Sequence, residues 1–236
     1  MNARVIGRLI AKDCSLMRVP IAVYTIAAIL GLILTVGFGT AGRGAGITLA
    51  LNVLIGVSFH VMLGPVLGER ERKTLAFVMS LPVTPRDYAV AKLLSSFVLF
   101  LIPATIAATS LVFLSPVDVF RAMAVSDRSV LAHVAGWVGY YGIVLGAWLL
   151  FFSVVLAAAI VSESIGWTIA VLTGLIFVVG NLVLQLAPAI GWIGRYLRAL
   201  SRGGPALPAT LAVEVAGIAL VVALMLALQG RKTSFV

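Results

Sequence analysis

Long runs of apolar residues, separated by short charged segments, constrain this chain more than any other feature of its sequence. A helix crosses the hydrocarbon core of a bilayer with about 20 apolar residues. Six runs are long enough, and Glu214 is the only Asp, Glu, Lys or Arg inside them. The runs are 20–40, 47–67, 93–114, 130–160, 165–186 and 207–228. We therefore expect an all-α integral membrane protein with six transmembrane helices, forming a single transmembrane domain over residues 1–236.

The composition excludes an ordinary water-soluble fold. The chain is 62% hydrophobic and 11% charged, whereas soluble domains carry about 25% charged residues. Cys14 is the only cysteine, which excludes a disulfide framework and a multi-cysteine metal site. A net charge of +9 can indicate nucleic-acid binding. Here the basic residues lie in short segments between apolar runs, which favours a lipid bilayer as the partner and no nucleic acid.

The distribution of Lys and Arg predicts the orientation. With the N-terminus in the cytoplasm, 11 of them fall on the inner side and 6 on the outer side. We therefore expect a multi-pass protein of the bacterial cytoplasmic (inner) membrane, with both termini cytoplasmic. The inner residues are Arg4, Arg8, Lys12, Arg18, Arg70, Arg72, Lys73, Arg86, Lys92, Arg231 and Lys232; the outer ones are Arg43, Arg121, Arg128, Arg195, Arg198 and Arg202.

Residues 1–18 have the pattern of an amphipathic helix that lies on the membrane. At 100° per residue, the basic residues share one arc and most apolar residues share the opposite arc. Asp13 falls on the apolar side, out of pattern. We expect an interfacial helix whose cations face lipid headgroups. The basic arc holds Arg4, Arg8, Lys12, Ser15 and Arg18, and the apolar arc holds Val5, Ile6, Leu9, Ile10, Leu16 and Met17.

A short external helix is expected before the last run. Pro188 and Pro208 bracket this outer connection. Trp192 and Tyr196 lie between them and are of the kind that anchors at a membrane interface. A loop that carries an aromatic belt is the alternative for this segment.

The segment 69–92 is the most highly charged connection. Acidic residues open a helical pattern over 69–81, as suits a helix N-terminus. Pro82 and Pro85 then break the helix. Thr84 can cap a new helix with Pro85 at its first position and Asp87 in its first turn. That helix would continue into the third run, which makes the segment a cytoplasmic helix–turn–helix suited to docking another protein.

This segment resembles the permease subunits of type-2 ABC exporters. The matching pattern is E-R-E-x-x-T-L, then S-L-P-V, then a charged turn and A-K-L. Lys73 departs from it, because the family usually has glycine there. The layout of the whole chain is also similar, and the small heme-exporter permeases share it. The matching positions are Glu69, Arg70, Glu71, Thr74, Leu75, Ser80, Leu81, Pro82, Val83, Arg86 and Lys92.

The resemblance implies a coupling helix in 69–92 that contacts an ATPase subunit, with a second, smaller contact at Glu163 in the turn V-S-E-S. Glu71, Arg86 and Asp87 would form a charged rim around that contact. The residues that we expect to couple to the ATPase are Glu69, Arg70, Glu71, Thr74, Leu81, Pro82, Arg86, Asp87 and Glu163.

The chain has no phosphate-binding G-x-x-x-x-G-K-[ST] loop. We expect the glycine-rich stretch 41–46, A-G-R-G-A-G, to be a turn. The chain itself is therefore expected not to be an enzyme and to bind no cofactor. ATP and Mg would be bound by the partner, in a complex of two copies of this chain with two ATPase subunits.

Polar residues inside the runs are candidates for a translocation path. Asn52 and His60 lie eight apart in the second run, and Asn181 and Gln185 lie four apart in the fifth. Such residues line a cavity or form hydrogen bonds between helices. Glu214 is either a contact in the path or a carboxylate that pairs with outer arginines near the interface. Those arginines are Arg195, Arg198 and Arg202.

Two other classes of protein compete with the exporter. A secondary transporter or channel is supported by Glu214 alone, because no internal repeat is evident. An intramembrane enzyme is disfavoured, because Ser58 lacks the second glycine of a tight nucleophile turn and H-E-x-x-H is absent. No catalytic or metal-binding residues are predicted. The cargo stays open among lipid, peptide, drug, polysaccharide and heme.

Overall fold

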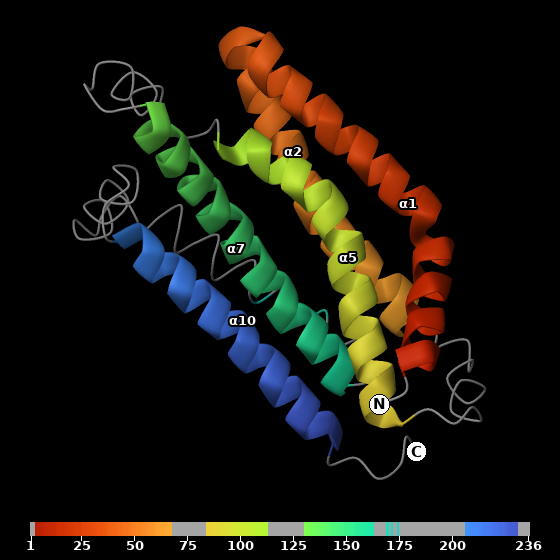
Figure 1. The fold of residues 1–236 in the computed structure, drawn as a ribbon. Coiled ribbons are helices and arrows are strands. Elements are labelled where there is room, and N and C mark those ends of the chain that lie inside the picture. Colours follow the sequence, from red (N-terminus) through yellow and green to blue (C-terminus); the bar gives the residue numbers. More distant parts are fainter. Residues whose placement is uncertain are drawn as a thin grey trace.

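The computed structural model describes residues 3–67, 84–112, 130–162 and 206–230, with the single positions 169, 171 and 174. All regular structure in these ranges is helical. The elements are α1 (Ala3–Gly37), α2 (Gly39–Val61), the π-helical turn η1 (Met62–Leu67), α5 (Pro85–Val112), α7 (Val130–Ser162) and α10 (Ala206–Gly230). Figure 1 shows a bundle with α1 at one edge, α10 at the other, and α5 and α7 between them.

Five of the described helices are long and apolar enough to cross a membrane, which confirms an all-α, multi-pass membrane protein. Their outer surfaces carry exposed large hydrophobic residues, as contact with lipid requires. The fifth predicted run, 165–186, is described only at the helical positions 169, 171 and 174. The segment between Pro188 and Pro208, predicted to hold an external helix, lies outside the described residues up to position 205. The five spans are Arg4–Gly37, Gly39–Pro65, Pro85–Val112, Val138–Val161 and Leu207–Gln229.

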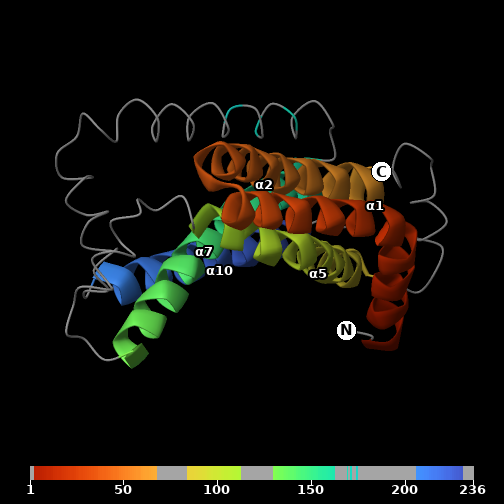
Figure 2. The same ribbon diagram turned by 90° about the horizontal axis from the view of Figure 1, so that it is seen from above.

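The predicted interfacial helix and the first predicted span form one continuous helix, α1. Pro20 lies inside it and cannot donate a hydrogen bond to the carbonyl of Leu16. Figure 2 shows the N-terminal part of α1 turned sharply away from the rest of the helix. We call residues 3–18 the elbow. Its start, the start of α5 and the end of α10 lie at the same end of the bundle (Figure 1).

The prediction of a turn at 41–46 is wrong, because these residues belong to α2. The chain reverses at Phe38 and Gly39 instead, and Gly39 has φ 62°, a left-handed conformation that glycine adopts without strain. The glycines of α2 serve close packing. A side chain at Gly46 would overlap the carbonyl oxygen of Gly31, so α1 and α2 approach each other as small residues allow in membranes.

The core lies where α1, α2, α5 and α7 meet. Small residues such as Ala28 and Ala50 are fully buried there. The rings of Phe100 in α5 and Phe152 in α7 stack at 4.3 Å between centroids. This close packing makes α5 the central element of the described bundle, in contact with α1, α2, α7 and α10.

Candidate functional site

A polar cluster is buried where the elbow packs on the first turns of α5. Lys92 Nζ donates to both carboxylate oxygens of Asp13, each at 2.9 Å. Ser95 Oγ donates to Asp13 Oδ2, also at 2.9 Å. All three residues are 0% exposed. We call these residues the Asp13 cluster.

The start of α5 determines which of its residues reach this cluster. Thr84 Oγ1 accepts a hydrogen bond from the Asp87 amide at 3.1 Å, and Pro85 is the first residue of the helix. The predicted cap, and its continuation into the third span, are thereby confirmed. Counted from this start, Tyr88, Lys92 and Ser95 follow at helical spacing and share one face, which lies against the elbow.

The elbow meets that face with its apolar arc. Ile6 and Leu9 pack against Tyr88 and Ala91 of α5. Asp13 continues the same buried face, and its carboxylate is the partner of Lys92. Lys92 Nζ also lies 5.5 Å from the centre of the Tyr88 ring, within range of a cation–π interaction. The apolar arc of the elbow is thus covered by protein from Val5 to Ile10, whereas Leu16, predicted on the same arc, is exposed.

The Asp13 cluster fixes the position of the elbow on α5 more than it adds to the stability of the folded protein. Removing two charges from water costs several kcal/mol per ion, and the attraction offsets this only when the remaining hydrogen bonds are made. Both oxygens of Asp13 are satisfied here, and Ser95 adds a further bond. Moving the elbow relative to α5 would break all of these bonds at once. The cluster therefore sets the register of the two helices.

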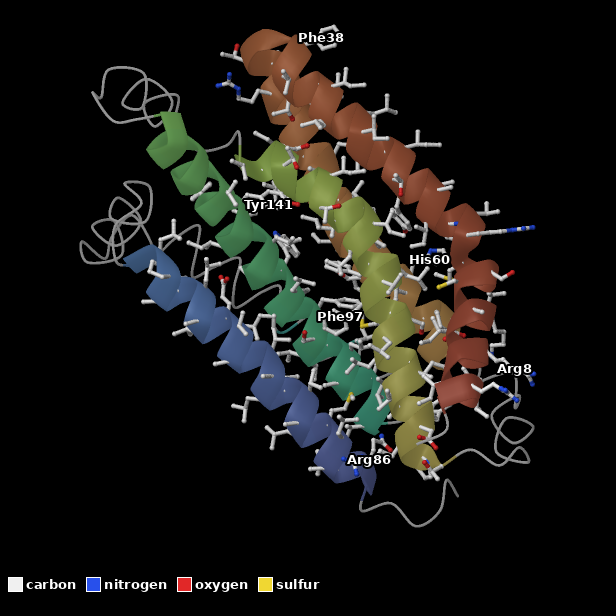
Figure 3. The ribbon with its side chains drawn as sticks, viewed as in Figure 1. Arg8, Phe38, His60, Arg86, Phe97 and Tyr141 are labelled. Carbon is white, nitrogen blue, oxygen red and sulfur yellow. The ribbon has the colours of Figure 1, made fainter. Side chains whose placement is uncertain are left out.

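Lys92 differs from its predicted place. We expected it on the inner surface, as one of the cations that orient the chain, but it is buried and paired. Asp87 also differs: expected on a charged rim, it is 4% exposed, and its Oδ1 has no hydrogen-bond partner among the described residues. Arg86 is exposed, as expected, at the start of α5 (Figure 3).

The signal for the pair was present in the sequence. Asp13 interrupted an apolar arc, and Lys92 began an apolar run. Each residue is costly in a buried setting without the other, since isolated buried charges are rarely tolerated. Two out-of-pattern residues of opposite charge could therefore have been paired before the fold was known.

The remaining predicted coupling residues cannot be placed beside this cluster. Glu69, Arg70, Glu71, Thr74, Leu81, Pro82 and Glu163 lie outside the described residues. The chain enters that segment after η1 and leaves it at Thr84, two turns before Lys92. The Asp13 cluster thus ties the elbow to the helix that follows the charged segment.

A second buried carboxylate lies between α7 and α10. Glu214 is 7% exposed and packs where Gly146 has no side chain. A methyl group at Gly146 would lie 3.0 Å from Glu214 Cδ and would overlap its Oε2. That oxygen has no hydrogen-bond partner in the described part of the chain. The arginines proposed to pair with Glu214 lie outside the described ranges.

The predicted path residues are not brought together. Asn52 and His60 are exposed on α2, where Asn52 Nδ2 donates to the Thr48 carbonyl at 2.8 Å. The His60 ring meets Tyr24 edge-on at 5.8 Å (His60 is labelled in Figure 3). Figure 1 places α2 and α10, which carries Glu214, on different sides of α5 and α7. Asn181 and Gln185 lie outside the described residues.

Over the ranges that the structure describes, no group of three or more His, Cys, Asp or Glu residues could hold a metal ion. Comparisons with protein-family models, with curated proteins and with solved structures find no match. Arguments about function therefore rest on the sequence motif and on the geometry of the buried carboxylates of Asp13 and Glu214.

Proposed function

We propose that this chain is the membrane-spanning permease subunit of an ABC exporter, which forms the translocation path and is coupled to ATP hydrolysis on a separate subunit. One observation supports this most. The charged, proline-broken segment that resembles a coupling helix leads directly into α5, and α5 is tied to the elbow by the Asp13 cluster. A force applied to that segment would reach two helices together.

The two ends of the segment differ in stiffness, which suits this role. At its entrance, η1 contains Pro65 and departs from regular α-helical hydrogen bonding. At its exit, α5 begins with the Thr84 cap and is fixed to the elbow eight residues later, at Lys92. A partner that moves the segment would displace α5 as a rigid body and deform η1.

The proposed complex has two copies of this chain and two ATPase subunits. ATP and Mg would be bound by the partner, because this chain has no phosphate-binding loop. The contact would use the predicted coupling residues other than Asp87, which is buried, with Arg86 at its exposed edge.

The test is purification of the chain with its ATPase. Single cysteines placed at Ser80–Asp87 should crosslink to that subunit. Leu81→Asp or Arg86→Asp should leave the chain inserted and abolish cargo-stimulated ATP hydrolysis. Ser15→Asp, on the exposed side of the elbow, is the control for added negative charge. Cysteines at 80–87 that react only with an impermeant external reagent would invert the orientation and overturn the proposal.

A secondary transporter is the second candidate, and Glu214 is the observation that favours it. Buried ionisable residues in membrane spans mark ion and proton pathways in transporters. Purified chain in liposomes, without any ATPase, distinguishes the two. Uptake driven by an ion gradient and lost in Glu214→Gln would favour the transporter; uptake only with the ATPase and ATP would favour the exporter.

A further inference from the structure

A stripe of exposed residues runs along α1, and it changes from basic to apolar part of the way along the helix. Exposed residues recur every three or four positions, so they lie on one side of the helix. The stripe is basic in the elbow and apolar from Leu16 onward, where the first exposed large hydrophobic residue of the chain occurs. Its members are Arg4, Arg8, Lys12, Leu16, Val19, Val23, Ile26, Leu30 and Ile33.

The acidic residue of α1 nearest to the basic half of the stripe is Asp13, 3.9 Å from Lys12 Nζ. Asp13 is the only acidic residue in α1. Its carboxylate is buried against α5 and held by Lys92 and Ser95. The opposite, apolar face of the elbow is covered by α5. The exposed surface of the elbow is therefore cationic. Arg8, for example, projects away from the bundle in Figure 3.

The length of the apolar half matches a membrane. Beyond the elbow, the exposed residues Val19 and Val36 are about 26 Å apart along the helix at about 1.5 Å per residue, close to the roughly 30 Å of a hydrocarbon core. The change from basic to apolar near the end of the elbow therefore falls at the boundary between hydrocarbon and headgroups. Arg18, also exposed, is near enough to this boundary to extend its guanidinium to the headgroups.

We propose that this stripe binds an anionic phospholipid of the surrounding membrane. Its phosphate is held by Arg4 and Arg8, and its acyl chains lie along Leu16 and Val19. Guanidinium groups form paired hydrogen bonds with phosphate oxygens. A free phosphate ion would use the basic half alone, whereas a phospholipid uses both halves of the stripe.

The test is lipid binding by the purified chain in a neutral detergent, measured by native mass spectrometry. The probes are phosphatidylglycerol and phosphatidylcholine with the same acyl chains. We expect phosphatidylglycerol to be retained preferentially and released as salt rises. Each cation near an anionic headgroup contributes about five-fold in affinity, so Arg4→Gln with Arg8→Gln should lower the affinity about 25-fold.

Matched variants complete the design. Arg4→Lys with Arg8→Lys keeps both charges and should keep binding within a few-fold. Arg43→Gln removes a cation near the start of α2, at the opposite end of α1, and should change nothing. Equal retention of the two lipids, full binding by the double Gln variant, or equal competition by inorganic phosphate would each overturn the proposal. No ATPase is needed, so the outcome is independent of the permease function.

Discussion

Two helix junctions in this protein bury a carboxylate, and they hold it in opposite ways. At the junction of the elbow and α5, Asp13 accepts three hydrogen bonds from Lys92 and Ser95. At the junction of α7 and α10, Glu214 fits over Gly146, and its Oε2 has no partner among the described residues. Directional bonds hold the first carboxylate in place, whereas among the described residues the second is held by its fit over Gly146.

This difference predicts which helices of the bundle can move relative to one another. Separating the elbow from α5 would leave Asp13 and Lys92 as unpaired charges, which is costly in a buried setting. Separating the Glu214 end of α10 from α7 breaks no described hydrogen bond of Glu214 and would allow its Oε2 to find water or a cation. The far end of α10 is held, because Gln229 Nε2 donates to the Ile160 carbonyl of α7 at 2.8 Å. We therefore expect the elbow and α5 to move together, and the Glu214 end of α10 to move relative to α7.

Breaking the paired junction should have the largest effect. Lys92→Met leaves Asp13 buried without its cation and should lower the free energy of unfolding by about 3–5 kcal/mol, measured by titration with a denaturing detergent. Asp13→Leu combined with Lys92→Met should recover most of this loss. Lys12→Met is the control, since Lys12 is half-exposed and 3.9 Å from Asp13. Equal losses in the single and double variants would show that the pair does not set the register.

Changing the sign of the second carboxylate should have the next largest effect. Glu214→Gln keeps the shape and hydrogen-bonding capacity, whereas Glu214→Lys buries a cation over Gly146 at a cost of roughly 3 kcal/mol. The Lys variant should unfold at lower detergent and transport less than the Gln variant. Identical behaviour of the two would mean that this site is open to lipid or water, which would remove the contrast between the junctions.

Filling the space beneath Glu214 should have a smaller effect. Gly146→Ala introduces a methyl that overlaps the carboxylate, at about 1–3 kcal/mol, partly offset by the gain of about 0.5–1 kcal/mol from replacing a helical glycine. Adding Glu214→Ala should relieve the overlap. Gly142→Ala is the matched control, because its methyl would lie 3.2 Å from the flexible end of Leu211. A Gly146→Ala variant as stable as this control would contradict the tight fit.

Removing the cap of α5 should have the smallest effect. Thr84→Ala leaves the Asp87 amide without its acceptor and should cost about 1 kcal/mol, whereas Thr84→Ser should be nearly neutral. The change should appear as faster hydrogen exchange at the first turn of α5, with the Asp13 cluster still protected. Loss of protection as far as Ser95 would show that the cap, and not the ion pair, fixes the start of this helix.

The sequence predicted the local features well and the distant ones poorly. The apolar runs and the cap at Thr84 are formed by residues close together in the sequence, so the sequence predicts them directly. Asp13 and Lys92 are 79 positions apart in the sequence. Each was considered only with its near neighbours in the sequence, so their pairing was not predicted. The stretch 41–46 was expected to be a turn because it lies in the short outer connection between the first two apolar runs. In a membrane, glycines in such a stretch can instead continue a helix and let it pack closely on its neighbour.

The short reversal at Phe38 and Gly39 has a consequence for biosynthesis. Because the link is so short, α1 and α2 must settle in the bilayer as a hairpin. Gly31 lies against Gly46 and Ala50, so this contact requires about the first half of α2 to have been made. Protein synthesis adds about 5–20 residues per second, so α1 has no contact with α2 at Gly31 for a time on the order of one to five seconds. During that interval the basic elbow is the feature of the nascent chain that can keep the new helix from sliding through the membrane.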